Sequence, residues 1–313
     1  MVQKVRQGII LPVFSFICLL HVDLFAQTFD DCNESEIDAC LLEFAVNRDA
    51  FKQIVCQGSL LQESNHQGKM WRDVPNAKET LVTTQFFIIQ DQTKKLYRKD
   101  WRVIDLTAED LKFDCWWSEV HRGKDIDNYV DGQKVESGEV FQSVVPFDVW
   151  SLAFSDSTSL REGTLSVNRW MEVFNSKKLL AVQESRDFVR GEWAFGPSSR
   201  VQAYFSKECG RMPTFVRYFV PNDREGVFSK KAVRAANEVH TEWIKLGDGW
   251  VPKKVRNVKE QFSQDAKPFS IKSLCFEFNW EGKLKIEEAF FDHSKFSSKN
   301  VQHSIETGIA ERE

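Results

Sequence analysis

The chain has 313 residues, of which 28% are charged and 42% are hydrophobic. Its formal net charge is −4, which argues against a dedicated nucleic-acid-binding protein, because such proteins carry a strong basic excess. This length is enough to bury a core in one or two domains, and the chain is rich in aromatic residues, with Phe 26 and Trp 10.

The N-terminus has the layout of a secretory signal peptide over residues 1–26. Lys4 and Arg6 precede an apolar run at residues 9–20, which is shorter than the about 20 apolar residues that span a bilayer. We expect cleavage after Ala26, with an uncleaved anchor as the alternative. The mature chain would be secreted or periplasmic, with no later transmembrane segment. Its net charge would be −5, because the leader takes two of the 42 basic and one of the 46 acidic residues.

Six cysteines remain after cleavage, and an even number in an exported chain permits disulfides. Sequence does not fix their pairing, although the first three lie close enough for one local bridge. The alternative is that several are buried small hydrophobes. No CxxC pair is present, so we expect neither a zinc site nor a redox centre, and no metal or cofactor. The six are Cys32, Cys40, Cys56, Cys115, Cys209 and Cys275.

The mature chain opens with a predicted helix. Ser35 is the expected N-cap, with Asp38 in the position of a capping-box acid. The apolar residues that follow recur at spacings of four, three and seven, which predicts one stripe packed against a sheet. These residues are Ile37, Leu41, Phe44 and Phe51.

Patterns of period two follow the helix. Residues 54–61 and 80–90 predict strands, and residues 86–89 (FFII) predict a strand covered on both faces. Asp131-Gly132 predicts a type I′ hairpin turn. Residues 96–104 predict a half-exposed antiparallel strand, with Tyr97, Trp101 and Val103 on one side and Arg98, Asp100 and Arg102 on the other.

The middle of the chain predicts a second helical region. Residues 149–154 fit a short turn, and an apolar helical face is formed by Val167, Trp170, Met171 and Phe174. From residue 179 the strand pattern returns, with turns at Cys209-Gly210 and at 247–249 (GDG). Residues 297–313 are polar and predict a flexible tail. No linker divides residues 27–296, so we expect a single α+β domain.

Three stretches resemble one known group of proteins. They are YRKDWRVID (97–105), VQAYFSKECGRMPTFVRYFV (201–220) and EWIKLGDGWVPKKVRN (242–257). With the order of signal, helix and long meander, they resemble the LolA/LolB-like lipoprotein-carrier superfamily, and in particular large uncharacterised secreted bacterial proteins related to it. The resemblance implies a strongly curved antiparallel β-sheet, or half-barrel, with the N-terminal helix and the mid-chain helical region packed on its concave side. No lipoprotein-handling residue of the carriers matches by position.

In such a half-barrel, alternate strand residues would line an apolar trough with a few polar handles. We therefore expect a non-enzymatic binding protein for a hydrophobic or amphiphilic ligand, such as a lipid or a lipoprotein acyl chain. The alternative for each aromatic ring is ordinary core packing. The candidate ligand-binding residues are Phe87, Trp101, Trp116, Trp170, Phe174, Phe205, Trp243 and Phe278.

Two other functions stay open. Exposed tryptophans could stack on sugar rings, giving a carbohydrate-binding or cell-envelope interaction module with peripheral association with the envelope. Glu119 and His121, two apart on a strand, would face the same way and could form the acid/base pair of a hydrolase. A Glu-x-His pair is a weak signal, however, and no nucleophile accompanies it, so we expect no catalytic residues.

Two charged stretches suggest ion binding only weakly. Residues 125–136 have the length of a calcium loop, but Val130 occupies the position that needs glycine, so a charged loop before a hairpin is the better interpretation. Lys253, Lys254, Arg256 and Lys259 could attract anionic headgroups. We favour a solvated strand face, with Lys254 and Arg256 on the same side.

Overall fold

The structure is a computed structural model of the chain. It describes residues 27–66, 80–105, 115–136, 145–155, 167–196, 199–221, 233–262, 268–281, 286–293, 297–299 and 302. The predicted signal peptide, residues 1–26, lies outside the described residues, as does most of the predicted tail. None of the helices in the described ranges combines the length and apolarity that crossing a membrane requires.

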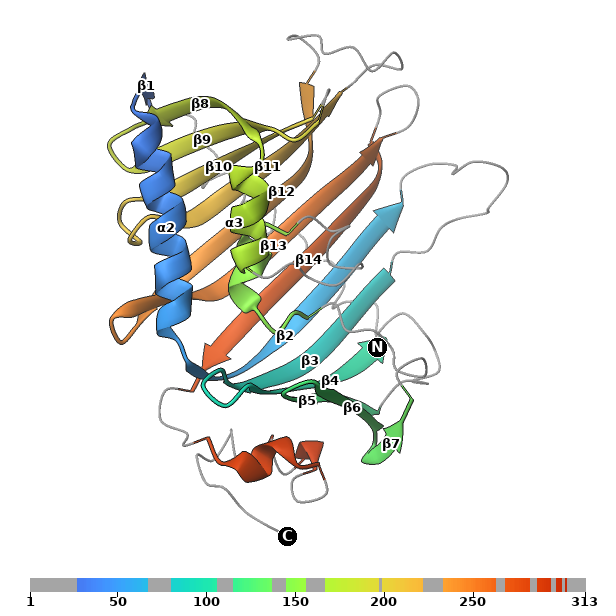
Figure 1. The fold of residues 1–313 in the computed structure, drawn as a ribbon. Helices are drawn as coiled ribbons and strands as arrows, with labels where there is room; N and C mark the ends of the chain where they lie inside the picture. The colour runs from blue at the N-terminus through green and yellow to red at the C-terminus, as the bar shows by residue number, and fades with distance from the viewer. Residues whose placement is uncertain are drawn as a thin grey trace.

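One antiparallel sheet of 14 strands dominates the described chain (Figure 1). The first seven strands are β1 (Asp30–Asp31), β2 (Gln53–His66), β3 (Thr80–Asp91), β4 (Leu96–Asp105), β5 (Trp116–Arg122), β6 (Asp125–Val130) and β7 (Gln133–Val135). The second seven are β8 (Lys178–Glu184), β9 (Phe188–Ala194), β10 (Arg200–Ser206), β11 (Met212–Pro221), β12 (Val233–Leu246), β13 (Gly249–Phe262) and β14 (Pro268–Trp280).

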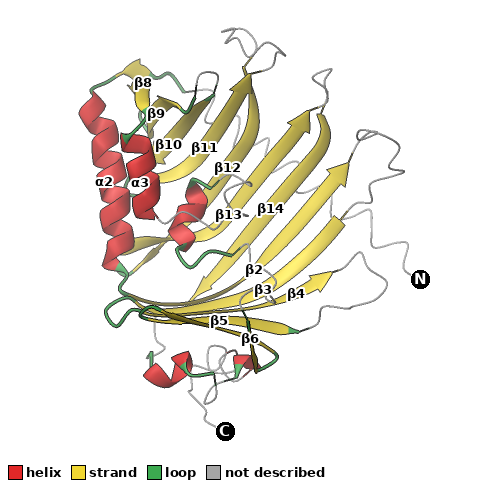
Figure 2. Cartoon of the chain, turned by 45° about the vertical axis from the view of Figure 1, so that its right-hand side comes forward, coloured by secondary structure: helices red, strands yellow, loops and turns green. Residues whose placement is uncertain are grey.

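The spatial order of the strands is β1-β8-β9-β10-β11-β12-β13-β14-β2-β3-β4-β5-β6-β7. Two meanders, β2–β7 and β8–β14, therefore join where β14 pairs with β2. The sheet is strongly curved and stays open, with helices on its inner face (Figure 2). The predicted α+β half-barrel is confirmed.

The N-terminal helix is α2 (Glu34–Ala50), and its predicted apolar stripe is buried at Ile37, Leu41 and Phe44. The predicted N-cap is wrong by two residues. Asn33 caps the helix, and its Oδ1 accepts a hydrogen bond from the backbone N–H of Ser35 at 3.0 Å. Asparagine is as good a cap as serine, and the cap starts α2 two residues earlier than predicted.

Two further helical elements cover the inner face, and both fall in the predicted mid-chain region. They are the 3₁₀ helix η2 (Val149–Ala153), which is buried along its whole length, and α3 (Val167–Asn175), which buries Val167, Trp170 and Phe174. α2 and α3 lie side by side within the curve of the sheet (Figures 1 and 2). A third element, η3 (Glu288–Phe291), lies on the outer side.

The sheet is covered on both faces at β3, as residues 86–89 predicted. Phe86 and Ile88 belong to the inner core, whereas Phe87 and Ile89 belong to a second, outer core with Phe290 and Phe291. All four strand residues are buried. Alternation along a strand sends neighbouring side chains to opposite faces, so each face here needs its own cover.

The strand β4 is not half-exposed, and that prediction is wrong. Arg98 and Asp100, expected to face water, are each 0% exposed. The outer face is covered by the C-terminal segment, described at residues 286–293 and 297–299. Arg98 Nη1 donates to the carbonyl oxygen of Phe290, 192 residues away, at 2.6 Å. Ser298 lies beyond the predicted domain end at residue 296, and its Oγ donates to Asp100 Oδ1 at 2.6 Å.

Local turn predictions are confirmed. Asp131 and Gly132 have φ of 46° and 85°, as a type I′ turn requires. Gly247, between β12 and β13, has φ of 61°. All six cysteines of the mature chain are free in the structure, so the local bridge that we considered is not formed. Cys40 and Cys56 are fully buried, and burial raises the pKa of each thiol to about 12.

Candidate functional site

The eight predicted ligand-binding residues are all buried, but they do not share one face. Six lie together in the inner core: Trp101, Trp170, Phe174, Phe205, Trp243 and Phe278. Phe87 and Trp116 lie in the outer core, with ring centroids 5.3 Å apart. Their neighbours Phe86 and Trp117 are the ones that face inward. Neighbouring residues of a strand face opposite sides of the sheet, and the sequence carries no signal for which member of each aromatic pair faces inward.

A short segment crosses the inner face between α2 and the sheet, and we call residues 145–155, which include η2, the strap. Side chains of the sheet hold it by donating to its backbone carbonyl oxygens. Lys99 Nζ donates to Val145 at 3.1 Å and Asn257 Nδ2 donates to Ser155 at 2.5 Å. Gln90 and Tyr218 donate in the same way to Phe147 and Phe154. The strap is therefore attached along its length by hydrogen bonds to its carbonyl oxygens, one from the charged Lys99 and three from neutral side chains.

Asp148 joins the strap to both helices. Its Oδ2 lies 3.2 Å from Arg48 Nη2 of α2 and accepts a hydrogen bond from the backbone N–H of Val167, at the start of α3, at 2.9 Å. Burial raises the pKa of the Asp148 carboxyl, and the charge of Arg48 opposes that rise. A carboxylate at a helix N-terminus is favourable, so this side chain positions all three covering elements at once.

The predicted pair Glu119 and His121 is brought together at the start of the strap. His121 Nε2 lies 2.6 Å from Glu119 Oε1, and Lys99 Nζ lies 3.2 Å from Glu119 Oε2. Burial raises the pKa of Glu119, but the His121 hydrogen bond and the Lys99 charge outweigh it and lower that pKa to about 2. Burial lowers the pKa of Lys99, and its ammonium also lies 4.6 Å from the ring centroid of Phe147.

No serine, threonine or cysteine is hydrogen-bonded to Lys99, Glu119 or His121 among the described residues. The three side chains satisfy one another and hold the carbonyl of Val145. Acid/base chemistry needs a substrate group or nucleophile within reach. The geometry instead shows a positioning role, in which the cluster holds the strap to β4 and β5.

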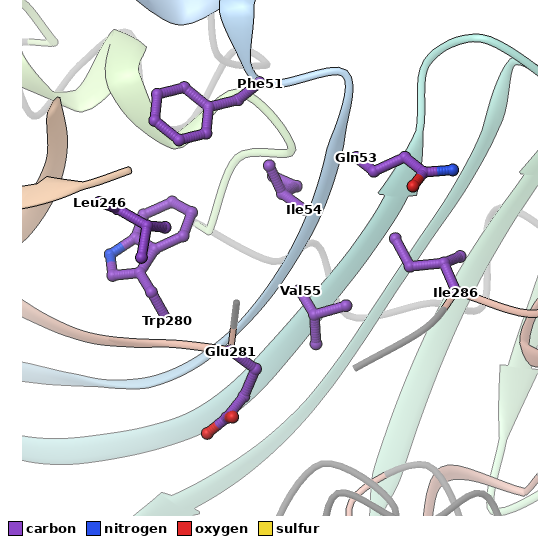
Figure 3. A pocket seen from close by; sticks show the side chains of 8 residues that line it. All are labelled: Phe51, Gln53, Ile54, Val55, Leu246, Trp280, Glu281 and Ile286. Atoms are coloured by element: carbon purple, nitrogen blue, oxygen red, sulfur yellow. The ribbon is translucent and has the colours of Figure 1, made fainter. Parts of the chain in front are cut away.

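A cavity of about 150 Å³ opens at the lower rim of the sheet, where α2 ends, β2 begins and β14 ends (Figure 3). We call it the rim cavity. Six of its eight lining residues are apolar by type, and polar groups also border it: Phe51, Gln53, Ile54, Val55, Leu246, Trp280, Glu281 and Ile286. None of the eight predicted residues lines it. Only the period-two continuation from Phe276 and Phe278 to Trp280 could have pointed to it from the sequence.

The rim cavity is directly behind the strap. The ring of Trp150 packs against two residues that line the cavity, with centroids 5.3 Å from Phe51 and 5.4 Å from Trp280. Trp150 Nε1 donates to the carbonyl oxygen of Trp250 at 3.1 Å. Phe276, Phe278 and Trp280 follow one another on β14 with centroid distances of 6.3 and 6.2 Å. An aromatic row thus leads from the inner face into the cavity.

The calcium-loop, metal-site and sugar-stacking hypotheses gain no support from the described residues. In residues 125–136, Asp127 pairs with Arg122 and Lys134, so the stretch is a charged hairpin. No group of His, Cys, Asp or Glu suited to a metal ion gathers in the part of the chain that the structure describes. Within that part no tryptophan is exposed; Trp250 and Trp280 are partly buried and the others are buried.

The basic run of β13 is divided between the two faces. Lys253 is exposed, and Lys254 pairs with Glu277 at 2.6 Å. Val255 and Asn257 face the inner core side, and Lys259 continues that alternation. Lys254 and Arg256 share the outer side, as predicted, whereas Lys259 does not belong with them.

No protein-family model matches the chain, and no curated protein matches it. Among solved structures it is similar to a domain from Vibrio parahaemolyticus that is provisionally described as an outer membrane lipoprotein-sorting protein. The identity is 9% and the TM-score 0.41, over 81% of this chain and 96% of that one. It is also similar to a DUF1329 family protein from Desulfovibrio piger, with 10% identity and a TM-score of 0.37, over 82% and 97% of the two chains. At these overlaps neither structure assigns a function to this chain.

Proposed function

We propose that the protein is a secreted or periplasmic, non-enzymatic binding protein for a hydrophobic or amphiphilic ligand, such as a lipid or a lipoprotein acyl chain. The observation that carries this proposal is the rim cavity of about 150 Å³, lined by Phe51, Leu246 and Trp280 and lying behind Trp150 of the strap. A cavity of about this size can hold a small apolar group, and six of the eight lining residues are apolar by type.

A longer ligand needs more room than the rim cavity holds. Trp150 is the side chain between the cavity and the inner core, because it contacts the lining residues Phe51 and Trp280 and is itself buried. A longer ligand would have to displace this ring to reach the aromatic row of β14. The predicted residues Trp101, Trp170, Phe174, Phe205, Trp243 and Phe278 belong to the inner core beyond it, and they remain part of the proposal.

The alternative functions gain less from the described residues. A sugar-stacking platform needs an exposed tryptophan, and none of the described tryptophans is exposed. A hydrolase at Glu119 and His121 needs a nucleophile within hydrogen-bond reach, whereas the described partners of the pair are each other and Lys99.

The test fills the cavity. The change Ile286→Phe adds a ring to a partly buried lining residue, and we expect delipidated variant protein to bind a fluorescent fatty-acyl probe at least about tenfold more weakly than the wild type. Its stability should be unchanged or higher, because the ring fills a void. The matched control is Ile126→Phe, at an isoleucine that is 57% exposed on β6.

Either of two results would contradict the proposal. The first is a delipidated wild-type protein that does not bind acyl probes of any length. The second is an Ile286→Phe variant that binds as tightly as Ile126→Phe. Probe binding that falls in both variants would show general damage to the fold, and circular dichroism melting of both proteins separates that case.

A further inference from the structure

Three polar side chains gather on the inner face of β12 and β13. Asn257 of β13 pairs in register with Val239 of β12, and Asn237 and Thr241 lie two residues to either side of Val239. Because Val239 belongs to the inner core, these side chains point to the inner face as well. Diagonal neighbours across such a pair are about 7–8 Å apart. We call Asn237, Thr241 and Asn257 the polar patch.

Four polar atoms of the patch have no hydrogen-bond partner among the described residues. They are both amide atoms of Asn237, Thr241 Oγ1 and Asn257 Oδ1. The three side chains are 4%, 5% and 2% exposed, in that order. A buried polar group without a partner is unfavourable, and native proteins nearly always satisfy such groups. Four of them on two neighbouring strands indicate that a polar group from outside the chain belongs beside them.

The donors and acceptors of the patch define the chemistry of that group. Asn257 Nδ2 donates to the carbonyl oxygen of Ser155, at the end of the strap, at 2.5 Å. A carbonyl only accepts, so the atom that Asn257 leaves unpaired is its acceptor, Oδ1. Asn237 adds another acceptor and two N–H groups, and the Thr241 hydroxyl can donate or accept. A carboxylate would leave both amide oxygens unpaired, whereas a hydroxyl or an amide both donates and accepts.

We infer that the polar patch binds the uncharged head group, bearing hydroxyls or an amide, of an amphiphile whose apolar chain extends toward the rim cavity. Thr241 pairs in register with Val255, and Val255 pairs with Phe276, where the aromatic row of β14 begins. From Phe276 the row continues for about 13 Å to Trp280, which lines the cavity. This inference rests on the proposed function and adds the class of head group.

The experiment compares four compounds that share one dodecanoyl chain: 1-dodecanoylglycerol, dodecanamide, methyl dodecanoate and dodecanoate. Each competes with the fluorescent fatty-acyl probe for delipidated protein. We expect the glycerol ester and the amide, which donate as well as accept, to bind at least about tenfold more tightly than the other two, which only accept. The ratio of the glycerol ester to the amide tells the two kinds of head group apart.

The variant Asn237→Leu/Thr241→Val should lose this preference while its affinity for methyl dodecanoate stays unchanged. Its melting temperature without ligand should be equal to or above that of the wild type, because the changes remove buried groups that have no partner. The matched control, Gln85→Leu, replaces an exposed amide of β3 and should bind like the wild type.

A pair of single variants makes the same test if the double variant does not fold. Thr241→Val exchanges the hydroxyl for a methyl group and should weaken the preference, whereas Thr241→Ser keeps the hydroxyl and should keep the preference. Equal selectivity in these two variants would contradict a role for the Thr241 hydroxyl in the head-group site.

The outcomes separate the inference from the proposed function. Equal binding of all four compounds, or a preference that survives in Asn237→Leu/Thr241→Val, overturns the head-group site and leaves the apolar site in place. A double variant that melts lower and keeps its selectivity would assign the patch to bound water, which also overturns the site. Loss of the preference in Gln85→Leu would place its origin outside the patch, with the same consequence. Failure of every compound to displace the probe, together with probe binding that is insensitive to Ile286→Phe, overturns the proposed function itself.

Discussion

The strap and the C-terminal segment cover opposite faces of one sheet, and they are held in different ways. On the outer face, the buried Arg98 and Asp100 are paired at 2.6 Å and are bonded to Phe290 and Ser298 of the C-terminal segment. The strap is held by hydrogen bonds that the sheet donates to its carbonyl groups. The same face carries the rim cavity and Asn237, whose amide has no hydrogen-bond partner among the described residues.

The outer and inner faces of the sheet differ in how far the protein's own groups fill and satisfy them. The Arg98–Asp100 pair is bonded within the protein, because Nε, Nη1 and Nη2 of Arg98 each donate a hydrogen bond and both carboxylate oxygens of Asp100 accept. On the inner face, within the described part of the chain, the buried amide of Asn237 makes no hydrogen bond and the rim cavity leaves unfilled space. Ligand binding is therefore expected beneath the strap and not beneath the C-terminal segment.

The largest effect should come from breaking the outer pair. Asp100→Ala leaves the fully buried Arg98 without its carboxylate, and we expect the free energy of unfolding to fall by about 3–5 kcal/mol. Urea denaturation measures it. Lys94→Ala is the control, because it removes an exposed pair with Glu288 in the same segment and should change little. Acyl-probe affinity of folded Asp100→Ala should equal that of the wild type; a weaker affinity would contradict the separation of the two faces.

Glu119, which pairs with Lys99 and His121 at the start of the strap, should make the stability of the fold depend on pH. The pKa of Glu119 is about 2 when folded, below its ordinary value of 4.5. The carboxylate therefore stabilises the fold above pH 4.5, and this contribution is lost as the pH falls toward 2. We expect Glu119→Gln to be less stable than the wild type by up to about 3 kcal/mol near neutral pH. The unfolding free energies of the two proteins, measured by urea denaturation, should converge as the pH falls toward 2. A difference that stays constant over this pH range would show that ionisation of Glu119 is not its cause.

The smallest effect should come from one neutral anchor of the strap. Gln90→Met removes the donor to the Phe147 carbonyl oxygen, which should cost about 1 kcal/mol. Hydrogen exchange of backbone amides in the strap should accelerate, whereas that of η3 should not change. Gln183→Met, which removes an exposed bond to Asp31 at the sheet edge, is the control. Equal acceleration in both segments would mean that the two covers open together.

Local features of the fold could be predicted from the sequence because short-range chemistry decides them. The turn at Asp131-Gly132, the stripe of α2 and the two-sided strand at residues 86–89 follow from backbone preferences and side-chain period. The half-exposed prediction for β4 failed for a different reason. Its charged face is covered by residues 192 positions away, and no local pattern reports a cover from that distance.

The candidate site was predictable only in part for the same reason. The aromatic content indicated an apolar inner face, but it did not decide between Phe86 and Phe87 or between Trp116 and Trp117. The rim cavity forms where the ends of separate elements meet, at Phe51, Leu246 and Trp280. Asn237 is an ordinary strand residue in sequence, and only its packing shows that its amide has no hydrogen-bond partner in the described ranges.

The pairing of β14 with β2 has a consequence for how the chain is made. The β2–β7 meander is synthesised early, but β14, the strand that pairs with the free edge of β2, is complete only when Trp280 has been added. Until that strand emerges, the edge of β2 offers unpaired backbone groups to any other chain. Premature termination before residue 268 would leave that edge open in every molecule, and we expect such products to aggregate. A holding chaperone that binds extended segments would meet its greatest need at this stage of synthesis.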